Sequence, residues 1–422
     1  MKSEIELRTL PNGLRVATLP CEAESIAFGL FVESGSRHET AKTAGMSHFI
    51  EHMLFKGTPT RSALQITQAI EGSGGNFNAC TGEEGTCYYA HMPDDRLEDA
   101  VDVISDMYLH ATIPDDEFER EKGVVLEEIK MYADEPDSVA MENLQRNLFP
   151  GSRLGAPVAG SPASLLPLRP ADMRRYIKTH YLPCNTIAVV VGNFDPECAF
   201  RIVSSRLGSF RRSSGALFSS KAAHGRVVRE QTVSREVQQT QIAIGYRTFG
   251  VRDPRKYAAS VFDALMGRGM SSRLFQEVRE KRGLSYDISS RMHMFSDAGA
   301  WTVTAGVDPG KAASAVRTID RELARICARR VSADELRRTK EFMIGNFRLS
   351  HERVTAKLFF CGSTLQSFGR IVRPEEQIDG IRAVTADDIR AVAQAVIRPG
   401  MRSISMVVPK ESASGGVSAG GR

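Results

Sequence analysis

Two histidines and a glutamate stand close together in GMSHFIEHMLFKG, the segment that runs from Gly45 to Gly57. If this segment is helical, His48 and His52 lie one turn apart, a spacing at which two imidazoles can share one tetrahedral metal ion. Glu51 lies about 60° from His48 around the helix and so shares its face. The HxxEH pattern therefore predicts a zinc site with a carboxylate on the same face of the helix.

The opposite arc of the same helix is apolar. It carries Phe49, Ile50, Met53 and Leu54, which can anchor the helix in a core and keep the ligand geometry rigid. The alternative is a surface helix on which two histidines happen to stand four residues apart. The amphipathic placement of the three chemical groups favours the metal site over this alternative.

A third ligand is needed from another element, because a catalytic zinc ion usually has three protein ligands and one open position. The helix predicted at 115–132 offers two adjacent candidates, Glu127 and Glu128. Helical angles place Glu128 beside the apolar stripe of that helix and Glu127 nearly opposite to it, toward water. Glu128 is therefore the better candidate.

Glu121 lies seven residues before Glu128, so the two side chains are nearly eclipsed on the helix. This position suits a supporting role, in which the carboxylate holds an imidazole or a ligand by a hydrogen bond. The alternative is that both glutamates only edge an amphipathic helix.

Length and composition limit the possible classes of protein. A chain of 422 residues with 42% apolar and 25% charged residues predicts a soluble protein of two domains. A net charge of only +4 argues against a nucleic-acid partner, and no apolar run reaches the roughly 20 residues that span a membrane. Seven cysteines without a CxxC pair, and the start MKSEIELRTL without the apolar stretch of a signal peptide, predict a cytoplasmic protein without disulfides.

The strand and helix signals occur in two similar series, which indicates a weak internal duplication and an α+β fold. The first series has strands at 7–10, 14–18, 26–32 and 186–191 and helices at 43–55, 61–71, 94–111, 115–132, 136–148 and 195–207. The second has strands at 241–246, 300–307 and 403–408 and helices at 254–266, 271–281, 309–329, 332–350, 352–366 and 385–396.

A segment rich in serine, glycine and basic residues separates the two series. It predicts a linker at 209–226 between a zinc-binding domain, 1–208, and a second, structurally similar non-catalytic domain, 227–411. The small polar residues of 412–422 predict a disordered tail.

The chain resembles the pitrilysin-like metallopeptidases, the inverzincins with an HxxEH motif, over nearly its whole length. The resemblance is closest to the mitochondrial processing peptidase beta subunit and its bacterial relatives, through SHFIEHMLFKGT, GNFNACTGEEGTCYY and MSSRLFQEVREKRGLSY. It implies two homologous domains, each a mainly antiparallel sheet flanked by helices, that form a half-shell. It also implies that His48, His52 and Glu128 bind one zinc ion per chain, with Glu51 as the general base and Glu121 at the family's second conserved glutamate.

The resemblance also implies that residues Asn76 to Tyr89 include the edge strand to which a substrate peptide adds. Asn78 and Ala79 match the family's substrate-binding positions on this edge. Without the zinc motif, an ordinary edge strand would be the preferred interpretation.

Arg279 and Tyr286 match a pair that reaches the substrate in the family, where a guanidinium and a phenol can stabilise the oxyanion of a tetrahedral intermediate. Taken alone, they would be read as a surface arginine and a half-buried tyrosine.

The function that the resemblance implies is that of a zinc endopeptidase, with Glu51 activating a zinc-held water. Its substrates would be peptides, unfolded polypeptides or presequence-like segments enclosed in a chamber. The expected assembly is a homodimer, or else a heterodimer with a homologue that lacks the motif. Two alternatives stay open: a non-catalytic core or partner subunit of the same fold, and a small zinc-stabilised binding module, for which Cys80 and Cys87 lack the usual ligand spacing.

Overall fold

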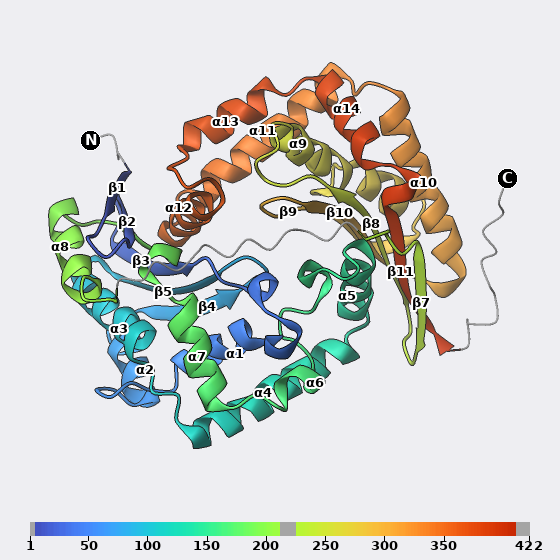
Figure 1. Ribbon diagram of the computed structural model, residues 1–422. Helices are drawn as coiled ribbons and strands as arrows, with labels where there is room; N and C mark the ends of the chain where they lie inside the picture. The colour runs from blue at the N-terminus through green and yellow to red at the C-terminus, as the bar shows by residue number, and fades with distance from the viewer. Residues whose placement is uncertain (1–4, 212–224, 411–422) are drawn as a thin grey trace. The chain divides into compact units, whose positions relative to one another are not determined.

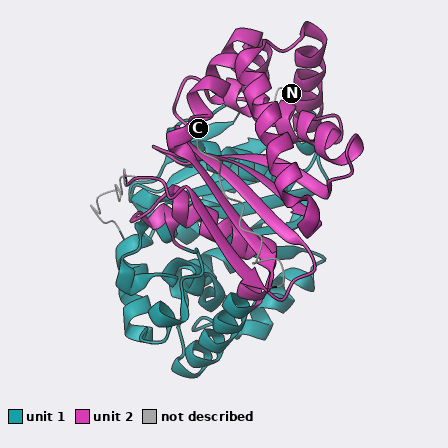
Figure 2. Ribbon diagram, turned by 90° about the vertical axis from the view of Figure 1, so that its right-hand side faces the viewer, with its two compact units in different colours: residues 1–130, 157–220, 348–372 teal, residues 131–156, 221–347, 373–422 magenta. Residues whose placement is uncertain are grey.

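The computed structural model describes residues 5–211 and 225–410, which form two compact units. Unit 1 consists of residues 1–130, 157–220 and 348–372, and unit 2 of residues 131–156, 221–347 and 373–422 (Figure 2). Each unit therefore includes a segment from the other half of the chain. Most of the predicted linker 209–226 and all of the predicted tail 412–422 lie outside the described residues.

Unit 1 is built on a six-stranded mixed sheet with the order β1-β2-β6-β3-β5-β4. Neighbouring strands are antiparallel except β2 and β6, which are parallel. The central strands β3 and β6 are almost wholly buried, because helices cover both faces of the sheet. The bounds of the strands are β1 Glu6–Thr9, β2 Arg15–Pro20, β3 Ser25–Val32, β4 Asn76–Thr81, β5 Thr86–Pro93 and β6 Thr186–Gly192.

Alternate side chains of these strands enter two different cores. Phe28 and Val190 pack with residues of helices α1, α3 and α8, whereas Phe31 and Val189 pack with residues of α12. Figure 1 shows α12 on the opposite side of this sheet from α1 and α3. The helices of unit 1 are α1 Met46–Leu54, α2 Ala63–Glu71, α3 Leu97–His110, α4 Asp115–Asp134, α6 Pro162–Leu165, α7 Pro170–His180, α8 Pro196–Leu207 and α12 Val354–Phe368. Helix α4 belongs to unit 1 only as far as Lys130. The unit also has the short 3-10 helices η1 Ser36–His38, η2 Ala41–Thr43, η3 Asp94–Arg96 and η5 Pro183–Asn185.

Unit 2 repeats this plan on a five-stranded sheet with the order β7-β11-β8-β10-β9. Its one parallel pair, β7 and β11, occupies the place that β2 and β6 hold in the first sheet. The strands are β7 Glu230–Arg235, β8 Thr240–Thr248, β9 Ser285–Met294, β10 Gly299–Val307 and β11 Arg402–Pro409. The shared strand order confirms the predicted α+β fold of two similar domains.

Helices cover both faces of the second sheet as well. One core joins the sheet to α9, α10 and α14, and the other joins it to α5. Thus α5 of the first half of the sequence belongs to unit 2, and α12 of the second half belongs to unit 1. The helices of unit 2 are α5 Pro136–Leu148, α9 Lys256–Gly267, α10 Ala312–Ala328, α11 Ala333–Ser350, α13 Pro374–Ala383 and α14 Ala386–Val396. Helix α11 belongs to unit 2 only as far as Phe347. The unit also has the short helices η4 Arg153–Gly155, η6 Phe275–Glu280, η7 Pro309–Lys311 and η8 Pro399–Met401.

No helix in the described ranges 5–211 and 225–410 combines the length and the apolar character needed to cross a membrane.

Candidate metal centre

Helix α1 carries the HxxEH motif, and its N-terminus is held in place by Glu39. The two oxygens of this buried carboxylate accept hydrogen bonds from the backbone N–H of Gly45 (2.8 Å) and of Ser47 (2.7 Å). These are two of the N–H groups that a helix leaves without internal partners, and a negative charge is favourable at this end. Glu39 therefore fixes the start of the helix that carries His48.

Gly45, the residue before α1, has φ +89°, which favours glycine. A Cβ at this position would lie 2.5 Å from the carbonyl oxygen of Ala159, so a larger residue would also collide with backbone. Phe49, Ile50, Met53 and Leu54 are buried as the sequence predicts, and they anchor the opposite face of α1. The helix is thereby rigidly placed.

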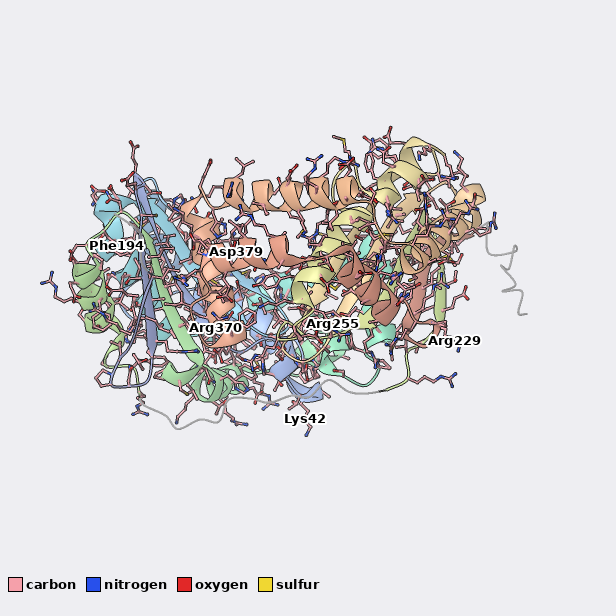
Figure 3. The ribbon with its side chains drawn as sticks, turned by 90° about the horizontal axis from the view of Figure 1, so that it is seen from above. Lys42, Phe194, Arg229, Arg255, Arg370 and Asp379 are labelled. Atoms are coloured by element: carbon pink, nitrogen blue, oxygen red, sulfur yellow. The ribbon has the colours of Figure 1, made fainter. Side chains whose placement is uncertain are left out.

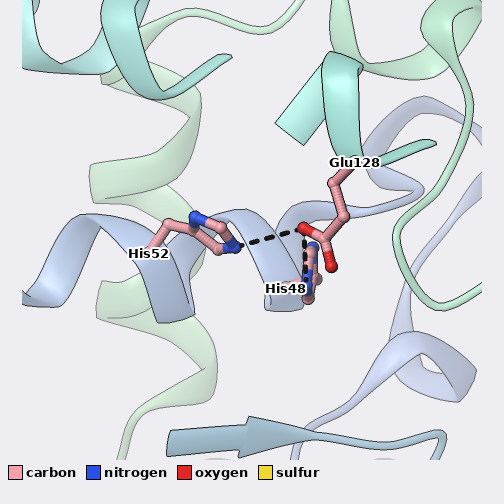
Figure 4. A group of neighbouring side chains, drawn as sticks. All are labelled: His48, His52 and Glu128. Atoms are coloured by element: carbon pink, nitrogen blue, oxygen red, sulfur yellow. Dashed lines mark ion pairs between the residues drawn. The ribbon is translucent and has the colours of Figure 1, made fainter. Parts of the chain in front are cut away.

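The structure brings His48, His52 and Glu128 together (Figure 4). Nε2 of His48 lies 3.6 Å from Oε2 of Glu128, and Nε2 of His52 lies 3.5 Å from the same oxygen. Two donors that are each about 2.0–2.2 Å from a tetrahedral zinc ion lie about 3.3–3.6 Å apart. Both histidine–glutamate distances are in this range, and ligand atoms of the three residues all lie within 4.8 Å of one another, so the group can hold one zinc ion.

The two neighbouring glutamates of α4 have opposite environments. Glu127 has a 72% exposed side chain that pairs with Lys130 at 2.6 Å, whereas the Glu128 side chain is 23% exposed and faces the two histidines. The rotation of about 100° per residue along a helix separates them. The structure thus brings Glu128, and not Glu127, to the histidines.

Glu121, one stacked position before Glu128 on α4, is buried behind His52. Its Oε2 lies 3.3 Å from Nδ1 of His52, and its Oε1 lies 2.5 Å from Nζ of Lys56. An acceptor at Nδ1 favours the tautomer whose Nε2 carries the lone pair that binds a metal ion. By contrast, Nδ1 of His48 is buried without a hydrogen-bond partner among the described residues.

Glu51 lies on the same helix but outside the group of three. The hydroxyl of Thr81 donates a hydrogen bond of 2.5 Å to its Oε2. Burial raises the pKa of the Glu51 carboxyl, and the hydrogen bond from Thr81 acts in the opposite direction. Thr81 ends strand β4, so the candidate base is tied to that strand.

Strand β4 is an outer strand of its sheet, since it pairs with β5 and with no other described strand. Asn78 is exposed on it, and Oδ1 of Asn78 accepts a hydrogen bond of 2.8 Å from the backbone N–H of Ala79. These are the two positions that the sequence predicts to contact a substrate.

Arg279 and Tyr286 lie in unit 2, on η6 and at the start of β9. The Arg279 guanidinium stands 4.8 Å from the centroid of the Tyr286 ring and 4.7 Å from that of Phe275. Tyr286 is 79% exposed, so it is not the half-buried tyrosine of the alternative interpretation. The two side chains form a cation–π pair at the surface of their unit.

Three residues at the centre were not predicted from the sequence: Glu39, Lys56 and Thr81. Each contacts a predicted residue or its helix, but each comes from a different segment. A glutamate six residues before a glycine, or a threonine at the end of a strand, is an ordinary feature of many sequences. Only the tertiary structure gives these residues their place.

A separate cavity of about 740 Å³ opens in unit 1 between η2, α6 and α7. Its lining includes Thr43, Tyr176 and His180, and Lys42 at its rim extends from the surface (Figure 3). None of the predicted site residues lines it. The candidate centre is therefore the histidine–glutamate group and not this cavity.

The sequence profile of the insulinase family, peptidase family M16, matches residues 15–161. The profile named peptidase M16 inactive domain matches residues 167–343. The first match contains His48, Glu51, His52 and Glu128, and the second contains Arg279 and Tyr286.

Curated relatives match over almost the full chain. An uncharacterized zinc protease of Streptomyces coelicolor is 35% identical over 417 residues, which cover 96% of this chain and 90% of the relative. The uncharacterized zinc protease YmxG of Bacillus subtilis is 33% identical over 391 residues, covering 92% and 95% of the two chains.

Solved structures share the fold. A protease from Helicobacter pylori superposes with a TM-score of 0.91 at 20% identity, covering 96% of this chain and all of that one. A Pseudomonas fluorescens protein described as a peptidase M16 inactive domain superposes with a TM-score of 0.87 at 17% identity, covering 96% and 98%. With two profile matches and full-length relatives above 30% identity, the chain belongs to the M16 family of insulinase-like, pitrilysin-type peptidases.

Proposed function

We propose that this protein is a zinc-dependent endopeptidase. The observation that carries the proposal is the position of Oε2 of Glu128, 3.6 Å from Nε2 of His48 and 3.5 Å from Nε2 of His52, distances that suit ligands of one tetrahedral zinc ion. The described residues contain one such group, so one zinc ion per chain is expected. The names of the bacterial relatives support the same metal and the same class of reaction.

The proposed reaction is hydrolysis of an internal peptide bond. Zinc, when bound, supplies a Lewis acid that polarises a peptide carbonyl and lowers the pKa of water toward about 7. Glu51 accepts the proton of the attacking water at its carboxylate and returns it to the departing amide nitrogen. Thr81 orients that carboxylate through its hydrogen bond to Oε2. Glu121 holds the ring of His52 through its contact with Nδ1, the ring nitrogen that does not face Glu128.

Strand β4 is the proposed docking edge for the substrate. Its outer backbone groups have no partner strand among the described residues, so an extended peptide can add to the sheet by main-chain hydrogen bonds. Asn78 and Ala79 would contact this peptide. Such binding depends mainly on the substrate's backbone and little on its side chains, which suits unfolded or presequence-like segments.

The proposed working form is a pair of chains that encloses the substrate in a chamber, with Arg279 and Tyr286 contacting it from one chain or the other. Because the HxxEH motif and Glu128 are intact, a homodimer is the economical arrangement. Light scattering tests this, and an active species at the monomer mass of 46.4 kDa would exclude it. Mixing Tyr286→Phe chains with Glu51→Gln chains tests sharing, because recovered activity requires residues from both chains at one centre.

A second candidate function is that of a non-catalytic partner subunit, because the profile over residues 167–343 carries the name inactive domain. That match excludes all three metal-binding candidates, which lie in the first profile, so the name applies to the other half of the chain.

The deciding experiment is incubation of the purified, zinc-loaded protein with a library of unstructured peptides. We expect cleavage at internal bonds, loss of cleavage with a chelator and its return when zinc is restored. A zinc-loaded protein that cleaves none of these peptides would favour the partner subunit. A metal-free protein that cleaves at the full rate would contradict the zinc mechanism.

A further inference from the structure

Two cysteines face each other at the edge of the first sheet, beside the candidate centre. Cys80 on β4 is paired directly with Cys87 on β5 in the antiparallel register. Directly opposed residues in such a pair have Cα atoms about 4.5–5.5 Å apart and side chains on the same face. A disulfide requires a Cα separation of about 4.4–6.8 Å, so the register suits a bond between these two sulfurs.

The two thiols differ in a way that suits a stepwise oxidation. Cys80 is exposed on the edge strand, whereas Cys87 is buried among the residues that pack against α12. The neighbouring Cys87 thiol lowers the pKa of Cys80, against the opposing effects of burial and of the charge of Glu51. Burial raises the pKa of Cys87. Cys80 is thus the accessible nucleophile, with a second thiol directly opposite it on the neighbouring strand.

This pair is connected to the candidate base through one residue. Thr81 follows Cys80 on β4, is paired with Thr86 and donates its hydroxyl to Glu51. A disulfide of about 2.0 Å would draw β4 against β5 at the position before Thr81. The edge proposed to bind substrate and the residue that orients Glu51 would both be affected.

We propose that Cys80 and Cys87 form a reversible disulfide that restrains strand β4 and slows the neighbouring centre. Hydrogen peroxide is the oxidant: the Cys80 thiolate attacks it, gains one oxygen as a sulfenic acid and releases hydroxide. The Cys87 thiol then attacks the Cys80 sulfur, the S–S bond forms, and the sulfenic oxygen leaves as water with the thiol proton. A dithiol reverses the reaction by exchange and becomes oxidised in turn.

The first test maps the bond in the full-length protein. Glu83 and Glu84 lie between the two cysteines, so a glutamate-specific protease separates them in the reduced protein. After treatment with peroxide, the two fragments should stay joined, with a mass lower by two hydrogen atoms than their sum with an intact thiol on each, and should separate on reduction. A link from Cys87 to the buried Cys361 of the same core, or a sulfinic acid at Cys80 without any link, would overturn the proposal.

The second test follows the strand itself and does not depend on activity. Amide hydrogen exchange in residues 76–81 should slow by about tenfold on oxidation and recover with a dithiol, because the bond restrains an outer strand. Cys80→Ser should abolish the change, whereas Cys198→Ser, a matched control on α8, should retain it. Unchanged exchange in a fully disulfide-bonded protein would overturn the restraint of β4.

The third test rests on the proposed peptidase function. Turnover should fall by about tenfold or more on oxidation at unchanged zinc content, since displacement of a reacting group by about 1 Å can cost up to about 10²-fold. Cys80→Ser should stay active under peroxide. Full turnover of the disulfide-bonded protein would overturn the proposal that the bond slows the neighbouring centre. If the reduced protein is inactive from the start, the proposed peptidase function fails, and the mapping and exchange tests still decide the disulfide.

Discussion

The hydroxyl of Thr81 donates a 2.5 Å hydrogen bond to Oε2 of Glu51, which links the last residue of strand β4 to helix α1, the helix of the HxxEH motif. The candidate base and the proposed substrate edge are therefore parts of one arrangement. A peptide bound along β4 would lie next to the carboxylate that serves it.

Removing this hydroxyl should slow catalysis without affecting the metal. A hydrogen bond to a charged group contributes about 1.5–3 kcal/mol, so Thr81→Val should lower kcat by about tenfold to a hundredfold. Thr81→Ser, which keeps the hydroxyl, is the matched control and should stay near the wild-type rate. Steady-state kinetics together with zinc analysis make the measurement, and equal rates for the two variants would show that Thr81 does not orient Glu51.

The two adjacent glutamates of α4 provide a matched pair for the metal. Glu128→Gln should lose most of its zinc, because an amide oxygen replaces a charged ligand, whereas Glu127→Gln should bind zinc as wild type does. Zinc content after dialysis against a weak chelator measures both. The assignment of the third ligand is wrong if Glu127→Gln is the variant that loses zinc.

Glu121 should matter for affinity and not for stoichiometry at saturating zinc. It accepts from Nδ1 of His52 and pairs with Lys56, so Glu121→Gln should weaken zinc binding by about 10- to 100-fold. Competition with a fluorescent chelator gives this affinity. Glu119→Gln is the control and should have the wild-type affinity, because this side chain of the same helix is 65% exposed and pairs with Lys122.

His180 should make unit 1 less stable in acid. Burial lowers its pKa to about 4, from an ordinary value of 6.5. Its ring stacks on that of Tyr176, with 3.6 Å between the ring centroids. The unfolded chain therefore binds the proton more readily between pH 6.5 and pH 4. The contribution of His180 is fully present above pH 6.5 and is lost as pH falls toward 4.

The expected loss is about 1–2 kcal/mol in the free energy of unfolding, after a discount for the partial exposure of the ring. Urea unfolding of zinc-free protein at pH 7 and pH 4.5 measures it, because metal release then adds nothing. His180→Gln should show a smaller difference between the two pH values. Equal differences in the variant and the wild type would contradict a neutral His180 in the folded state.

The sequence predicted the parts of the site that depend on helical period alone. His48, Glu51 and His52 lie within one helix, and the choice between Glu127 and Glu128 follows from the angle between successive residues. The hydrogen bonds of Thr81 and Glu39 depend on how separate segments meet, which no local pattern specifies. The roles of Asn78, Ala79, Arg279 and Tyr286 stay predictions, as does the particular likeness to the processing peptidase beta subunit.

The fold shows the same division between local and tertiary information. The long helices and the apolar strands β3, β6 and β8 lie close to their predicted positions, because burial on one or both faces leaves a strong pattern. Helix α7 was missed because, of its mostly polar residues, only Met173 and Tyr176 are buried. The edge strands β7 and β9 were missed for a similar reason, since polar side chains interrupt their alternation.

The assignment of α5 to unit 2 and of α12 to unit 1 also cannot be predicted from the sequence. Helices α5 and α12 each have an apolar stripe, which predicts burial against a sheet. The stripe does not indicate against which of the two sheets the helix packs. Contiguous domains were therefore the simplest expectation, and the structure instead assigns each of these helices to the other unit.

The most direct test of the central claim is the turnover of Glu51→Gln at full zinc occupancy. We expect one zinc ion per chain, as in the wild type, and a kcat lower by about 10² to 10⁴, the usual contribution of a general base. Zinc analysis and peptide hydrolysis on the same sample give both values. A variant that keeps its zinc and still turns over at the wild-type rate would show that Glu51 is not the general base.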